Sequence, residues 1–201
     1  MVTGEHPPRR GRGRRPADEV RAEILAAAGD LLIAGGMGAF TIDKVAAHSG
    51  ASKMTIYKWW PSKGALALDG YFHRVEDQLE FPDTGDIEVD LRAQLHAFLA
   101  LMREGRVGPV IAELIGQAQS DPDLKTAYLQ SYSAPRRALA VSALNTAKAR
   151  GQLRADLDPE TVIDQLWGAC YHRLLIPDQP LDEQFVDALV DNLFRGVAAR
   201  G

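Results

Sequence analysis

Apolar residues recur every three or four positions along most of the chain, which is the spacing of an amphipathic α-helix. The first such stripe starts at Ala17 and stops at glycines 35, 36 and 38. Further helical patterns cover about 41–49, 52–60, 63–80, 89–104, 107–119, 123–150, 159–175 and 181–199, with glycines, prolines and Asp-Pro pairs between them. Sustained strand alternation is missing from the sequence. The pattern therefore predicts an all-α fold of roughly nine helices.

One short segment has the steric features of two helices that cross closely. In residues 41–60, Gly50 can take the positive φ of a tight turn, and Ser52 can cap the helix that follows it. Val45, Ala51 and Ile56 are spaced to meet in a small core beneath the crossing. This pattern predicts a helix-turn-helix whose second helix enters the major groove of DNA.

The predicted second helix presents cations, hydroxyls and aromatic rings, namely Lys53, Met54, Thr55, Tyr57, Lys58 and Trp59. Lysine, threonine and tyrosine suit phosphate contacts, and lysine or a methyl group suits a base edge. The alternative is an ordinary helical hairpin whose polar residues face water. That alternative leaves unexplained why no acid occurs between Ser49 and Leu68 in a chain whose acids outnumber its bases.

Charge is distributed unevenly along the 201 residues, whose formal net charge is −4. Residues 1–65 hold ten Lys and Arg against six acids, and the remainder holds thirteen against twenty-one. Only one end of the protein therefore suits a polyanion, although a basic tail on an unrelated domain would give the same balance.

Within the N-terminal region, residues 1–16 form a basic arm that we expect to be disordered. Its arginines are suited either to a DNA minor groove or to non-specific phosphate attraction from a solubilising tail: Arg9, Arg10, Arg12, Arg14 and Arg15.

The ordered motifs of residues 17–68 resemble the TetR/AcrR family of transcriptional regulators. The resemblance lies in Gly-Met-Gly-Ala-Phe-Thr at 36–41, Gly-Ala-Ser-Lys-Met-Thr-Ile-Tyr at 50–57 and Trp-Trp-Pro-Ser-Lys-Gly-Ala-Leu at 59–66. It implies backbone contacts for Thr41 and Tyr57, a phosphate contact for Lys63, and base reading by Lys53 and Met54. Met54 departs from the family, in which many members have a small residue there. The full set of expected DNA contacts is Thr41, Lys44, Ser52, Lys53, Met54, Thr55, Tyr57, Lys58, Trp59 and Lys63.

The resemblance divides the chain into the arm, a helix-turn-helix domain over 17–64, and a helical effector-binding and dimerisation domain over 65–201. The last two helical patterns are unusually apolar, which favours pairing with a second copy over burial within one monomer. TetR-family proteins dimerise through these helices. The expected dimer contacts are Trp167, Phe185, Leu189, Leu193 and Val197.

The family also implies a small-molecule effector inside the larger domain. Candidate ligand residues are polar or aromatic side chains on apolar helix faces, although such stripes are more often core: His96, Phe98, Met102, Tyr128, Tyr132, Trp167 and Tyr171. We expect no cofactor and no metal, because the five histidines lack metal-ligand spacing. A Gly-x-Ser-x-Gly elbow is also absent, so we expect no enzyme.

The rest of the composition points to a cytoplasmic protein without a membrane partner. The single cysteine, Cys170, excludes an intrachain disulfide, and no apolar run approaches the roughly 18 residues of a membrane span. The N-terminus does not resemble a secretory signal.

The sequence thus predicts a ligand-responsive repressor that binds a palindromic operator in double-stranded DNA as a homodimer. The alternative is a helical-bundle adaptor with a basic arm and no sequence-specific DNA reading.

Overall fold

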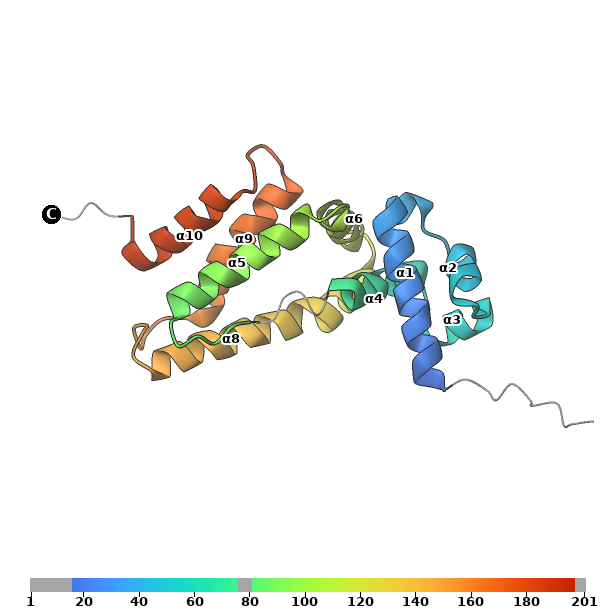
Figure 1. Ribbon diagram of the computed structural model, residues 1–201, viewed down its shortest axis with the longest axis horizontal. Coiled ribbons are helices and arrows are strands. Elements are labelled where there is room, and N and C mark those ends of the chain that lie inside the picture. Colours follow the sequence, from blue (N-terminus) through green and yellow to red (C-terminus); the bar gives the residue numbers. More distant parts are fainter. Residues whose placement is uncertain (1–15, 76–80, 198–201) are drawn as a thin grey trace, which may run out of the picture.

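The computed structural model describes residues 16–75 and 81–197, and the regular elements in these two ranges are all helices (Figure 1). The all-α prediction is confirmed. The elements are α1 (Ala17–Ala39), α2 (Ile42–Ser49), α3 (Lys53–Trp59), α4 (Lys63–Val75), α5 (Ile87–Arg103), α6 (Val107–Ala118), α7 (Pro122–Tyr128), the π-helical turn η2 (Leu129–Ser133), α8 (Ala134–Ala149), α9 (Pro159–Leu175) and α10 (Glu183–Arg195). Because η2 joins α7 to α8, the described residues form nine helical runs.

Side-chain caps determine where most of these helices begin. Asp86, Asp121, Asp158 and Asp182 each accept hydrogen bonds from backbone N–H groups of the first turn of α5, α7, α9 and α10. The last helix is shorter than the pattern over 181–199 predicted, because it begins after Asp182 and ends where Gly196 takes a φ of 71°. Its expected end at 199 and the expected end of the fourth helix at 80 lie outside the described residues.

The long helix predicted over 123–150 is interrupted by η2. Pro135 follows this turn, has no N–H to donate to Ser131, and would press its ring on that carbonyl in a regular α-helix. The π-helical turn accommodates the proline and carries Tyr132. A hydrophobic period alone cannot reveal this turn, because the apolar stripe continues through it.

Helix α1 is long and apolar enough to cross a membrane by length and composition, which the sequence analysis did not anticipate. Its apolar residues have another role in the fold, because Ile24, Ala28 and Leu32 are fully buried against the rest of the chain. Gly36 interrupts the helix with a φ of 66°, as the predicted glycine stop requires.

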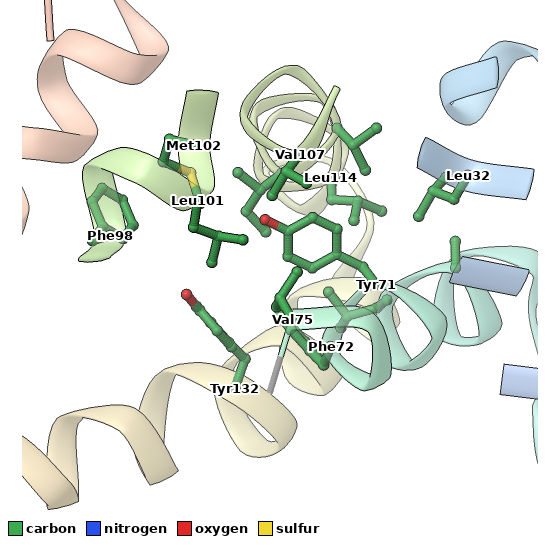
Figure 2. Packing of buried hydrophobic residues seen from close by; sticks show 14 of the residues in the cluster. Leu32, Tyr71, Phe72, Val75, Phe98, Leu101, Met102, Val107, Leu114 and Tyr132 are labelled. Carbon is green, nitrogen blue, oxygen red and sulfur yellow. The ribbon is translucent and has the colours of Figure 1, made fainter. Parts of the chain in front are cut away.

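The helices form two connected parts (Figure 1). Helices α1–α4 lie at one end of the molecule, α5 and α8–α10 lie at the other, and α6 stands between them. The boundary expected after residue 64 falls inside α4, which packs on α1 and also on α6 and α7. Figure 2 shows Tyr71 of α4 lying beside Val107 and Leu114 of α6, so one continuous core spans both parts.

Two glycines set the distance between α1 and α4. A Cβ atom at Gly70 would lie 2.7 Å from Ala28 Cβ and 2.9 Å from Gly29 N, both closer than packed atoms allow. We predict that Gly70→Ala destabilises the fold by about 1–3 kcal/mol through overpacking, measured by urea unfolding. Gly116 is the matched control, because a Cβ there meets nothing within 4 Å.

In the control, Gly116→Ala should raise the free energy of unfolding by about 0.4–1 kcal/mol, because alanine lowers the entropy of the unfolded chain. Equal stabilities of Gly70→Ala and the wild type would contradict the close approach of the two helices.

Candidate DNA interface and ligand cavity

Helices α2 and α3 form the crossing that the sequence predicted. Gly50 joins them with a φ of 67°, and Val45 and Ile56 are fully buried beneath it. Thr41 accepts a hydrogen bond from the Lys44 N–H at 3.3 Å, and the Ser52 hydroxyl accepts one from the Thr55 N–H at 3.1 Å. The expected cap at Ser52 is therefore present.

The outer face of α3 is exposed. The Met54 side chain is 85% exposed and Tyr57 is 53% exposed, although both are large apolar groups. Lys53 and Lys58 are exposed beside them. Thr55 and Trp59 are only partly accessible, since Thr55 lies 2.9 Å from the Ser52 hydroxyl and the Trp59 ring packs edge-on against Trp60. Helix α3 thus offers a protruding surface of mixed cationic and apolar character.

An acid from α2 lies against this surface, which the acid-free stretch after Ser49 did not suggest. The Asp43 carboxylate forms an ion pair with the Lys53 ammonium and, chiefly through this hydrogen bond, raises the pKa of Lys53. Lys53 therefore stays charged and has its ammonium placed at one edge of α3. Asp43 is ten residues away in sequence, so only the helix crossing brings the two together.

Two predicted DNA-contacting lysines also hold the backbone around the glycine interruption. Lys44 Nζ donates to the Ala39 carbonyl at 2.6 Å, and Lys63 Nζ donates to the Met37 carbonyl at 3.1 Å. An ammonium has three protons, so each lysine keeps donors for a phosphate. The arm arginines at positions 9, 10, 12, 14 and 15 lie outside the described residues.

The Met37 peptide group also connects the DNA-proximal part to the larger one. Its N–H donates to Glu113 Oε2 of α6 at 2.9 Å, while its carbonyl accepts from Lys63. Arg106 lies 4.0 Å from the other Glu113 oxygen. Sequence reasoning missed Glu113, because 76 residues separate it from Met37 and no local motif marks it.

A cavity of about 230 Å³ opens between α5, η2–α8 and α9. Five of the predicted ligand residues line it together, and their role as ligand contacts stays a prediction: Phe98, Tyr128, Tyr132, Trp167 and Tyr171. Sequence reasoning missed Gln94, Arg136 and Arg137, which also line it. It also missed apolar residues of the lining such as Phe81 and Ile163, since only a few polar or aromatic side chains on each helix were singled out.

Two expected ligand residues are placed elsewhere, which corrects their assignment to the cavity. His96 Nε2 lies 2.9 Å from Asp187 Oδ1 of α10, in a charged cluster that also includes Arg92. Met102 is buried in the core between α5 and α6 (Figure 2). His96 is two residues before Phe98, so it lies on another face of α5, toward α10, whereas Met102 shares the face of Phe98 and packs in the core.

The cavity wall is in direct contact with α4. The Tyr132 ring stacks on Phe72 with centroids 4.2 Å apart and planes 2° apart. Burial raises the pKa of Tyr128 to about 12 and raises the pKa of Tyr132 and Tyr171 as well, so the three phenols stay protonated at neutral pH. A displacement of the Tyr132 ring therefore acts directly on α4 through its contact with the Phe72 ring.

The expected dimer contacts differ in how much they serve the monomer. Val197 is 87% exposed, whereas Leu189 and Leu193 are partly buried against the monomer core. The Arg173 guanidinium covers Phe185 at 3.5 Å from the ring centroid, and Trp167 lines the cavity. The dimer role of these residues stays a prediction.

Two family models cover most of the chain. The model described as bacterial regulatory proteins of the tetR family matches residues 24–69, and the tetracyclin repressor-like C-terminal domain matches 81–193. The second match alone exceeds half of the chain. The chain belongs to the TetR family of bacterial transcriptional regulators. As a TetR-family member it is a DNA-binding transcriptional regulator and not an enzyme, which the sequence analysis predicted.

Full-length relatives agree with the family models. The chain is 41% identical over 187 residues to the HTH-type transcriptional regulator YdeS of Bacillus subtilis, covering 92% of this chain and 93% of that protein. It is 32% identical over 177 residues, 86% and 90% of the two chains, to the DNA-binding transcriptional repressor TetR of Mycobacteroides abscessus.

A solved structure agrees with these relatives. The crystal structure of the TetR family transcription regulator SCO0332 is 60% identical, with a TM-score of 0.85 over 90% of this chain and 100% of that one. The adaptor alternative is thereby superseded.

Proposed function

We propose that this TetR-family regulator is a repressor that binds a palindromic operator as a homodimer and releases it when a small molecule enters the cavity. The observation that carries the proposal is the exposed face of α3, where large side chains and two lysines protrude without a monomer partner for their apolar surface. Such a face suits base edges and phosphates in a major groove. A repressor among the relatives supports the direction of control.

Ligand response is supported by the contacts between the two parts of the molecule. Tyr132 in the cavity wall stacks on Phe72 of α4, and Glu113 of α6 binds the Met37 peptide that also binds Lys63. A ligand that prefers one arrangement of these helices changes the spacing of the two recognition helices in a dimer. Operator affinity then falls by the coupling free energy between the two sites. We expect this to happen in the cytoplasm, where the DNA is.

Selection of bound sequences from a random pool of duplex DNA tests the proposed function. We expect a palindromic consensus whose half-sites lie about one helical turn apart, because two α3 helices related by a two-fold axis read the same groove pattern. The log of operator affinity should fall with log salt by about 0.9 per phosphate contact. Recovery of no consensus from the pool would contradict specific reading.

Lys53 provides a sharper prediction at one base pair. Lys53→Ala should relax selection at one position of each half-site, with a loss of about 1–3 kcal/mol there, measured by repeating the selection. Asp43→Asn is the control, because it keeps Lys53 but weakens its ion pair. That control should keep the consensus. Uniform weakening over all sequences by Lys53→Ala would make Lys53 a phosphate contact.

A further inference from the structure

Arg21, on the second turn of α1, lies beside the residue that ends α3. Its guanidinium carbon is 5.6 Å from the centroid of the Trp60 ring, and Trp60 is the C-cap of α3. Trp60 is buried and the Arg21 side chain is 54% exposed, so the guanidinium lies on the outer side of the ring. A cation over an aromatic face is attracted by the ring. This contact therefore holds a positive charge at the C-terminal end of α3.

The charge of Arg21 is only weakly balanced by the protein. In the part of the chain that the structure describes, Asp69 of α4 is the one carboxylate within 4.0 Å of its guanidinium, at 3.9 Å. That distance is too long for a hydrogen bond, and an ion pair between exposed groups contributes little. The same Asp69 oxygen already accepts the Trp60 indole N–H at 2.8 Å. The N–H donors of Arg21 are therefore available to an acceptor from outside the protein.

Arg21 also complements the cations that we expect on DNA phosphates. Lys44 and Lys63 bind the Ala39 and Met37 carbonyls, where α1 ends. Arg21 lies sixteen residues before Met37, which corresponds to roughly 24 Å along a helix. A helix in the major groove has a phosphate strand on each side. Cations near both ends of α1 thus suit the two strands that border α3.

We propose that Arg21 binds a phosphate of the DNA backbone and is part of the DNA interface. A planar guanidinium can donate two parallel N–H groups to one phosphate, and the Trp60 ring orients its plane. Arg21 exchanges its long ion pair for the phosphate, while Asp69 keeps the Trp60 N–H. The proposal needs only the DNA binding of the family, and neither repression nor an effector.

The salt dependence of DNA affinity tests this contact. The probe is a DNA duplex that carries the selected consensus, or a duplex of random sequence if the selection recovers none. For each bound subunit, we expect Arg21→Met to flatten the slope of log affinity against log salt by about 0.9. Binding at about 0.15 M salt should weaken about fivefold per subunit through the same counterion release. Methionine keeps an unbranched apolar stem beside Trp60.

Two further variants separate charge from shape. Arg154→Met is the matched control, because it removes the same charge from an exposed arginine, paired with Asp156 in the connection between α8 and α9. It should keep the slope and the affinity of the wild type. Arg21→Lys keeps the charge and should keep the slope, although lysine lacks the two parallel donors of arginine.

An unchanged slope in Arg21→Met overturns the proposal. An equal loss of affinity at every salt concentration would show instead that Arg21 acts by holding Trp60 and α3 in place. A changed consensus in a repeated selection would also overturn it, because it would make Arg21 a base contact. Circular dichroism and urea unfolding of the variants should match the wild type. Failure of the proposed function is a separate result, since it is seen as the absence of a consensus, whatever the salt slopes are.

Discussion

A protein carrying Ala188→Arg should sediment as a monomer and lose about 10²–10⁴-fold in operator affinity. In a dimer, binding of one subunit holds the other near the second half-site at a high effective concentration, and a monomer lacks this gain. Ala188 is exposed on α10, next to the partly buried Leu189 on the flank that does not face α5. In a two-fold interface each substitution occurs twice, so two arginines would meet with like charge. Sedimentation equilibrium and a gel-shift titration measure the two effects.

Ala188 is a better site for this test than the apolar residues beside it. Leu189 and Leu193 are packed against the monomer core, so glutamate at these positions would also destabilise the monomer. Ala149→Arg is the matched control, since it places the same side chain on an exposed position of α8. The control should remain dimeric and bind operator as the wild type does.

Two outcomes would contradict the prediction. A folded Ala188→Arg protein that remains a dimer would show that the dimer interface lies elsewhere on the molecule. A folded monomer with undiminished operator affinity would show that a two-fold dimer is not needed to bind the operator.

Local features of this chain were predictable, because they depend on residues that are neighbours in sequence. Gly50 has to take a positive φ in a turn of three residues, and Ser52, the last of them, caps the helix that begins at the next residue. The family motif lies in the same stretch. The sequence therefore predicted the helix-turn-helix together with its turn and its cap, while the DNA contacts of its residues stay a prediction.

Features that join distant residues were not predictable in this way. His96 lies on an apolar helix stripe and was assigned to the ligand site, but Asp187, 91 residues away, holds its ring on the surface. The partner of the Met37 amide, Glu113, is equally remote. Hydrophobic periodicity reports which face of a helix is covered and does not report which residue covers it.

The aromatic half of the cavity could be predicted and its charged half could not. Tyr128 and Tyr132, and likewise Trp167 and Tyr171, stand out in the sequence as rings four residues apart. Arg136 and Arg137 also line the cavity, but charged residues on a helix usually face water, so nothing in the sequence marks them. The π-helical turn before them places Tyr132 at the cavity, and its only sequence signal is Pro135.

The second large effect is expected on the effector response of the protein when Glu113 is replaced, because its carboxylate connects α6 to the end of α1. Glu113→Ala should leave the Met37 N–H without its acceptor from α6, so that helix α6 can shift without displacing the end of α1 or Lys63. In the wild type we expect a bound effector to lower operator affinity by about 5–150-fold. In Glu113→Ala this factor should fall toward one. By linkage, the effect of operator on effector affinity should shrink by the same factor.

The measurement is operator affinity without and with a small molecule that calorimetric titration shows to bind the wild-type protein. Glu113 does not line the cavity, so effector binding in the absence of DNA should persist in the variant. Glu113→Gln is the matched control, because its amide oxygen can still accept the Met37 N–H while the negative charge is lost. We expect the glutamine variant to keep most of the response, which would assign the coupling to the hydrogen bond and not to the charge. A folded Glu113→Ala protein that keeps the full response would contradict this prediction. The effector would then act on the helix-turn-helix through another contact, and the stacked pair of Tyr132 and Phe72 would be the next contact to change.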